Sequence, residues 1–217
     1  LKSLEVSKPV TMVAADLAMA LAPCDRFPGL KLLSSEGVPT DKNLVAFCLR
    51  KWKKVKRSEK ILAALADKIA DEFDLIPLFI PMQHPDDVRF LKKVMYHMTR
   101  PGYIMQKRYS VDQTLSILGN AKMVVGMRLH SLIYAAKLSI PMVGLAYEPK
   151  VNYFMQSINQ PYVNWDRYFS MEDLMEKISN VWTNASRIRR ELDEIKPVFE
   201  EKVKEAMELT LSLLPDE

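Results

Sequence analysis

The sequence is poor in cysteine, with only Cys24 and Cys48 among its 217 residues. Two cysteines are too few for a disulfide scaffold or a thiolate zinc site, so we expect a protein of a reducing compartment that has no metal centre. A long hydrophobic run is also lacking, because no apolar stretch approaches the ~20 residues that span a membrane. We therefore predict a cytoplasmic protein.

Neither sign of charge dominates the chain. Its 31 Lys and Arg residues are nearly balanced by 27 Asp and Glu residues, which gives a formal net charge of +4. This balance does not indicate a nucleic-acid-binding protein, so any anion binding must be local. The opening residues, LKSLEVSKPV, have neither an initiator Met nor the apolar region of a signal peptide, and we expect that the chain begins midway through a longer protein.

From Lys42 onward, short apolar strands alternate with amphipathic helices. Near-continuous apolar strands separated by helices are typical of a parallel sheet that is covered on both faces. We therefore predict an α/β fold with a Rossmann-like parallel sheet and helices on both faces. The predicted strands lie at residues 44–49, 75–82, 103–105, 123–126 and 142–147.

The two ends of the chain are patterned differently from this middle. Residues 1–40 give a strand at PVTMVAA, then DLAMALAP, then a stretch of Pro and Gly that we interpret as a linker, so we assign them to the tail of another domain. Residues 41–183 form the Rossmann-like domain. Residues 184–217 form an amphipathic helical segment in which Pro197 is expected to kink or restart the helix.

Polar side chains follow four of the predicted strands. Since ligands of open parallel sheets bind outside the carboxyl ends of the strands, we expect these groups to meet in one crevice. Two of them, Arg128 and His130, stand at the beginning of a helix, where free amide groups and the helix dipole favour an anion. The pattern predicts a site for a small anion with phosphate, carboxylate or both, built from Arg50, Gln83, His84, Asp86, Arg128, His130, Glu148 and Lys150.

Each of these residues also has a plainer explanation. His130 is compatible with a structural histidine beside an apolar helix face, and YEPK, residues 147–150, with an ordinary helix start. The stretch RKWKKVKR, residues 50–57, is basic enough to touch nucleic acid or an anionic membrane surface, although a solvated loop explains most of it.

The segment VVGMRLHSLIYAA, followed by IPMVGLAYEPKV, resembles the C-terminal half of the polysaccharide pyruvyl transferase family, in particular the CsaB-type enzymes of bacterial cell walls. PVTMVAADLAMAL is similar to the last strand of that family's first domain. AFCLRKW is similar to its G-I-S-V-R-x-W strand, and FIPMQHPDD to its P-M-Q-x-x-x-D turn. The sequence departs from the family pattern at Leu17, Ala46, Cys48 and Glu148.

The resemblance implies the second domain of a GT-B-like two-domain enzyme, which transfers pyruvyl from phosphoenolpyruvate to a sugar of a cell-wall polysaccharide precursor as a cyclic ketal. Phosphoenolpyruvate is then the donor substrate, with no cofactor and no metal. The partners implied are this donor and a saccharide acceptor, with no nucleic acid. A lipid-linked acceptor and peripheral contact with the inner face of the membrane are compatible with this reading.

The resemblance also assigns roles to individual residues. His130 is the candidate general acid or base, and Arg128 the second catalytic residue. Substrate binding falls to Arg50, Gln83, Asp86, Tyr147 and Lys150. Among these, the cations would hold the anion, and Asp86 would orient a sugar hydroxyl.

Two other functions remain open from the sequence. A GT-B nucleotide-sugar glycosyltransferase would use the same architecture and a similar cationic cleft. A non-catalytic module would bind polyanions through RKWKKVKR, with an affinity that falls steeply with salt.

Overall fold

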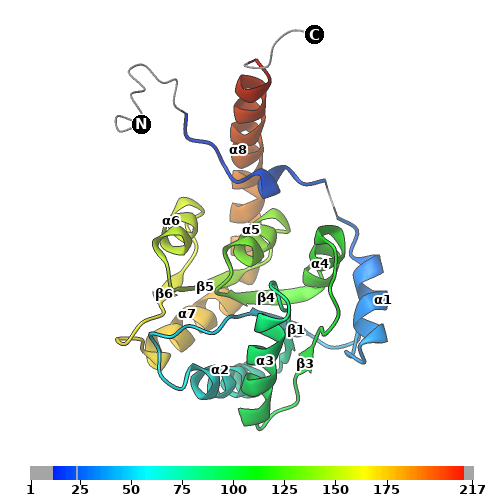
Figure 1. Ribbon diagram of the computed structural model, residues 1–217, viewed down its shortest axis with the longest axis vertical. Helices are drawn as coiled ribbons and strands as arrows, with labels where there is room; N and C mark the ends of the chain where they lie inside the picture. Colours follow the sequence, from blue (N-terminus) through cyan, green and yellow to red (C-terminus); the bar gives the residue numbers. More distant parts are fainter. Residues whose placement is uncertain (1–11, 23, 213–217) are drawn as a thin grey trace.

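The computed structural model describes residues 12–22 and 24–212, which form a six-stranded sheet covered by helices (Figure 1). All strand pairs are parallel, and the spatial order is β3-β2-β1-β4-β5-β6. The predicted α/β class with a Rossmann-like parallel sheet is confirmed. The strands are β1 (Leu44–Cys48), β2 (Ile76–Phe79), β3 (Tyr103–Ile104), β4 (Ala121–Gly126), β5 (Met142–Ala146) and β6 (Tyr162–Asn164).

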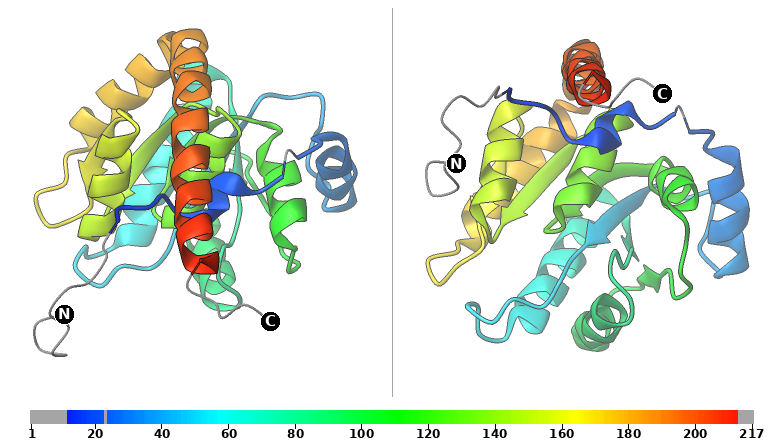
Figure 2. Two further views of the ribbon diagram at one scale, coloured as in Figure 1. Left: turned by 90° about the horizontal axis from the view of Figure 1, so that it is seen from above. Right: turned by 45° about the horizontal axis from the view of Figure 1, so that its top comes forward.

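The central strands are apolar on both sides because helices cover both faces of the sheet. Every residue of β1 and β5 is buried. Helices α4, α5 and α6 lie on one face and α2, α3 and α7 on the other (Figures 1 and 2). Their bounds are α2 (Ser58–Phe73), α3 (Asp86–His97), α4 (Val111–Leu118), α5 (Leu129–Lys137), α6 (Pro149–Ser157) and α7 (Met171–Thr183).

One strand was absent from the sequence prediction. The edge strand β6 has three residues, of which only Val163 is buried, so it carries neither an apolar run nor a clear alternation. The strand is defined by its parallel pairing with β5, in which Val163 is the register partner of Leu145. Such a short segment becomes a strand through its neighbour rather than through its own sequence.

The stretch interpreted as a linker contains a helix, α1 (Phe27–Ser35), and that interpretation is wrong for these residues. Pro28 stands in the first turn, where a missing amide hydrogen costs nothing. Gly29 lies against α4: its amide donates to Ser116 Oγ over 2.6 Å, and the same hydroxyl donates to the carbonyl of Asp25. The Pro and Gly that suggest a linker are therefore a helix start and a close helix contact.

Gly29→Ala is expected to destabilise the protein by about 1–3 kcal/mol through overpacking. A Cβ atom at Gly29 would lie 2.1 Å from the carbonyl oxygen of Ser116, which belongs to the backbone and cannot move aside. The matched control is Gly119→Ala, whose Cβ would lie 3.0 Å from the Arg26 side chain and 3.3 Å from the Leu115 carbonyl oxygen, both much longer than 2.1 Å. Urea unfolding of both variants tests this, and equal midpoints would contradict the proposed contact.

The residues before α1 also differ from the prediction. Of the strand predicted at PVTMVAA, residues 9–11 lie outside the described part of the chain, and residues 12–15 carry no strand. A 3₁₀ turn, η2 (Leu17–Ala20), follows, capped by the Asp16 carboxylate, and its Met19 is buried. This segment contacts α5 and α8, so it packs on the domain described here. Whether residues 1–40 also belong to a further domain stays a prediction.

The C-terminal segment forms one long helix, α8 (Ala185–Leu211), that extends past the body of the molecule (Figures 1 and 2). The helix continues through Pro197 rather than restarting there. Lys137 at the end of α5 binds Glu200 at 2.6 Å, and Val203 is buried, which holds this half of the helix against the domain. In residues 12–22 and 24–212, no helix is long and apolar enough to cross a membrane.

Candidate functional site

The register between β1 and β4 brings two arginines together. Cys48 pairs with Gly126, and the two arginines, Arg50 and Arg128, each come two residues later. This is the point where strand order reverses, and crevices of parallel sheets form there. A hollow of about 450 Å³, called here the central hollow, is lined by Arg50, Met82, Gln83, Arg128, Leu129, His130, Tyr134, Tyr147 and Lys150.

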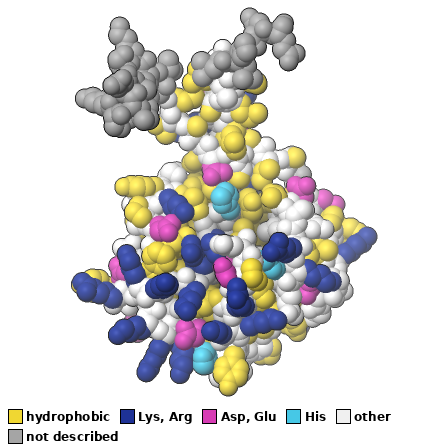
Figure 3. All heavy atoms as spheres, in the orientation of Figure 1, with side chains coloured by type: hydrophobic (Ala, Val, Ile, Leu, Met, Phe, Trp, Pro, Cys, Tyr) yellow, Lys and Arg dark blue, Asp and Glu magenta, His cyan; other side chains and the backbone are white. Residues whose placement is uncertain are grey.

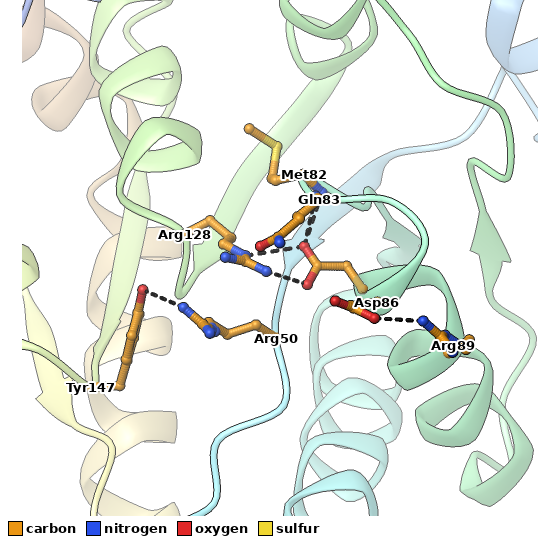
Figure 4. A network of polar contacts seen from close by, with 8 residues as sticks. Arg50, Met82, Gln83, Asp86, Arg89, Arg128 and Tyr147 are labelled. Atoms are coloured by element: carbon orange, nitrogen blue, oxygen red, sulfur yellow. Dashed lines mark hydrogen bonds and ion pairs between the residues drawn. The ribbon is translucent and has the colours of Figure 1, made fainter.

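Arg128 is fixed by a carboxylate beneath the hollow. Its Nη2 and Nε donate to Asp87 Oδ1 and Oδ2 over 2.5 and 3.1 Å, as the dashed lines at Arg128 show (Figure 4). Asp87 is almost fully buried. Asp87 Oδ2 also accepts the amide hydrogens of Met82 and Gln83. A planar guanidinium bound on one edge by a fixed carboxylate has a single orientation, and Nη1 makes no hydrogen bond within the described residues.

Asp86 lies at the edge of the predicted site and not in the central hollow. Its side chain is about two-thirds exposed and pairs with Arg89 on the next turn of α3, at 2.6 Å (Figure 4). It lines a neighbouring hollow of about 450 Å³ together with three other predicted residues, Arg50, Gln83 and Arg128, and does not line the central one. The neighbouring residue, Asp87, is the one that organises the site. The signal was available, because the pattern P-M-Q-x-x-x-D counted from Pro81 ends at Asp87.

Arg50 is held by aromatic rings on the other side of the hollow. Its Nη1 donates to the hydroxyl of Tyr147 over 3.2 Å, and its guanidinium lies 5.1 Å from the Tyr147 ring (Figure 4). Trp52 packs edge-on against Tyr147 with ring centroids 4.8 Å apart. Arg50 thus adds a second guanidinium, aligned without a carboxylate partner among the described residues.

His130 stands at the open rim of the central hollow. Its side chain is 60% exposed, and Nε2 lies 3.9 Å from Oδ2 of Asp16, the residue that caps η2. Next to it, burial and then the charge of Asp16 raise the pKa of Tyr134, so its phenol stays protonated. The sequence analysis missed Asp16 and Tyr134, since no spacing relates Asp16 to His130.

The last predicted residue, Lys150, lies in the first turn of α6. Its Nζ is 3.0 Å from Glu148 Oε2 and its side chain remains more than half exposed. The amide N–H groups of Leu129 and His130, in the first turn of α5, donate to no partner in the described chain. Gly126 lets α5 approach this closely, because a Cβ there would lie 2.7 Å from Leu132 Cδ2. Two helix starts and three cations therefore surround one hollow.

The described residues also bear on two other types of site, a nucleophilic cysteine and a metal-binding cluster. Burial raises the pKa of the Cys48 thiol to about 12, so at neutral pH it is not a thiolate nucleophile. Over the ranges 12–22 and 24–212, no group of three or more His, Cys, Asp or Glu is placed to hold a metal ion.

Cations gather on the face below the hollow. Figure 3 shows many Lys and Arg side chains over the region of the β1–α2 loop, α2 and α3. In the stretch RKWKKVKR, the residues Lys51, Lys53, Lys54, Lys56 and Arg57 are exposed. Val55 is buried and Trp52 packs on Tyr147, so the apolar residues of this loop belong to the domain core and the site.

A family model for polysaccharide pyruvyl transferase matches residues 1–149 of the chain. The chain belongs to the polysaccharide pyruvyl transferase family. The matched range includes six of the seven predicted site residues, and Lys150 directly follows it. No curated protein matches the chain.

Solved structures with the same fold include glycosyltransferases. The ADP-heptose lipopolysaccharide heptosyltransferase II of E. coli has a TM-score of 0.62 and 12% identity, with 85% of this chain and 57% of that chain covered. A glycosyltransferase of Rickettsia africae has a TM-score of 0.59 and 12% identity, with 92% of this chain and 54% of that chain covered. A family 9 glycosyltransferase of Veillonella parvula has a TM-score of 0.57 and 12% identity, with 76% of this chain and 53% of that chain covered.

This member of the polysaccharide pyruvyl transferase family thus shares its Rossmann-like fold with GT-B glycosyltransferases. It spans a little more than half the length of these three structures. At 12% identity the likeness concerns the fold and not the substrate.

Proposed function

We propose that the central hollow binds phosphoenolpyruvate and that the protein transfers its pyruvyl group to two hydroxyls of a saccharide as a cyclic ketal. One observation carries the proposal: Arg50, Arg128 and Lys150 line a single hollow, beside the free amides of α5. Phosphoenolpyruvate carries a phosphate and a carboxylate close together, and such a compact anion matches guanidinium groups and helix starts.

The reaction balances without a cofactor. The methylene carbon of the enol phosphate takes up a proton, one sugar hydroxyl adds to the neighbouring carbon, the carbon–oxygen bond to phosphate breaks, and a second hydroxyl closes the ketal. The two hydroxyls lose two protons, of which one replaces the proton given to carbon and one leaves with phosphate. The products are therefore the ketal carboxylate and hydrogen phosphate.

The side chains at the hollow suit the steps of this reaction. His130 is the proposed general acid or base, because its imidazole lies at the open rim, where donor and acceptor would meet. Arg50 and Arg128 are fixed before the substrate arrives, by Tyr147 and Asp87, so they can stabilise the charge that moves onto the leaving phosphate without reorganisation.

Other parts of the sequence prediction enter the proposal unchanged. We propose Gln83 and Tyr147 as further substrate contacts, since both line the central hollow. Asp86 stays a proposed substrate contact from the neighbouring hollow, and Asp87 is added with a positioning role through Arg128. The CsaB-type subtype, a cell-wall acceptor and attachment of that acceptor to a lipid stay predictions.

Calorimetric titration of the 217-residue chain with phosphoenolpyruvate tests the donor. We expect binding that Lys150→Ala weakens and Lys122→Ala leaves unchanged, since Lys122 is exposed on β4 outside the hollow. A ligand at 100 times its Kd stabilises the native state by about 2.7 kcal/mol, so Tm gives a second readout. Binding of UDP- or ADP-sugars in place of phosphoenolpyruvate would favour the glycosyltransferase alternative and overturn the proposal.

A further inference from the structure

A second hollow shares Tyr147 with the central one. It measures about 430 Å³, within the usual range of small-molecule sites, and lies at the carboxyl ends of β5 and β6. Four aromatic side chains line it, namely Trp52, Tyr147, Tyr153 and Trp165. Of these four aromatic residues, Tyr147 alone is also part of the donor site proposed above. This second hollow is called the aromatic hollow.

Three of these four aromatic residues, Trp52, Tyr147 and Tyr153, are partly or largely exposed, whereas Trp165 is 1% exposed and offers almost no surface to a ligand. Trp52 is half-buried, yet its indole nitrogen is fully buried, so its exposed atoms are ring carbons. Tyr153 lies on α6 with 70% of its surface exposed. Ring faces carry negative charge density and attract the C–H face of a sugar ring.

Amide side chains line the same hollow as these rings. Asn152 Nδ2 donates to Asn164 Oδ1 over 3.0 Å, which fixes two amides that retain donor and acceptor capacity. The charged residues of the lining are Lys54, Glu148 and Asp166. Glu148 pairs with Lys150 over 3.0 Å, and Lys54 and Asp166 carry opposite charges, so the lining has no excess of cations that would hold nucleotide phosphates. A neutral polyhydroxylated ligand is the better match.

We propose that the aromatic hollow is a saccharide subsite, which holds a sugar unit of the acceptor. This inference rests on the proposed pyruvyl transfer. Tyr147 lines both hollows, so a sugar bound against Trp52 lies one aromatic ring away from the donor. An oligosaccharide seated there extends its neighbouring unit toward His130, and this domain contributes to acceptor recognition. Placing hydroxyls near the donor in this way lowers the entropic barrier to transfer.

Saturation-transfer NMR on the 217-residue chain tests the subsite, with the methyl glycosides of glucose, galactose, mannose and N-acetylglucosamine as probes. We expect at least one probe to bind with a millimolar Kd and Tyr153→Ala to weaken that binding at least threefold. Tyr96→Ala is the matched control, because Tyr96 is 85% exposed on α3 and lies outside the hollow. The control should bind sugar as the parent does.

The same samples are titrated with phosphoenolpyruvate, which separates the two proposals. If sugar binding depends on Tyr153 but phosphoenolpyruvate does not bind, the result would support the saccharide subsite and overturn the proposal that phosphoenolpyruvate is the donor. The opposite outcome is phosphoenolpyruvate binding with no NMR response from any of the four glycosides at concentrations up to about 20 mM. That outcome would overturn the subsite proposal and leave the donor proposal standing. Loss of sugar binding in both tyrosine variants, or binding of UDP in the aromatic hollow instead, would also overturn the subsite proposal.

Discussion

Asp87→Asn is expected to destabilise the protein by about 3–5 kcal/mol, the usual cost of removing one partner of a buried ion pair. Asp87 is 1% exposed and satisfies the guanidinium of Arg128 together with the amides of Met82 and Gln83. An asparagine has one acceptor oxygen in place of two, and its NH₂ group would face donors. Arg128 would also lose its counter-charge and its orientation.

The neighbouring aspartate supplies the control for this experiment. Asp86→Asn removes an exposed pair with Arg89, and such pairs contribute about 0–1 kcal/mol. Urea unfolding of both variants and of the parent measures the difference. Equal stability of the two variants would mean that the Asp87–Arg128 pair does not hold the site together.

His130→Ala is expected to lower pyruvyl transfer by about 10²–10⁴-fold, the typical contribution of a general acid or base. Because the side chain is 60% exposed, the substitution removes little packing and Tm should stay close to that of the parent. The measurement is acceptor-dependent release of phosphate from phosphoenolpyruvate by the full-length protein, together with Tm of each variant.

His97→Ala is the matched control for His130, since His97 ends α3 outside the central hollow. It should transfer pyruvyl at the parental rate. Near-normal turnover of the His130 variant would exclude the catalytic role. Unfolding of that variant would instead assign His130 to the fold, and retained phosphoenolpyruvate binding distinguishes lost chemistry from lost donor affinity.

The strands and the helices between them follow from local pattern. The runs that become β1 and β5 are apolar throughout, and that of β4 is apolar except for the exposed Lys122, because both faces of the sheet are covered. The helices between them repeat apolar residues on one side. The polar residues that end these strands are equally visible in the sequence, and the parallel topology brings them to one edge. Arg50, Arg128, His130 and Lys150 could therefore be predicted as neighbours.

The sequence pattern was misleading where a residue serves a contact with a distant part of the chain. Pro28 and Gly29 have the composition of a linker, yet α1 exists because Gly29 fits against Ser116, which lies far away in the sequence. The three residues of β6 have no strand signal of their own and depend on pairing with β5. Local propensity cannot report such contacts, since their energy comes from the partner.

The sequence by itself determined the α/β class, the strand order along the chain and the cations at the strand ends, because periodicity and strand-end position are local properties. Only the tertiary structure decided which carboxylate serves Arg128, that Asp16 lies beside His130, and that Tyr147 separates two hollows. Asp86 and Asp87 differ by a single step along the chain, but a helix turns about 100° between consecutive residues. That rotation buries one carboxylate under the site and leaves the other in solvent.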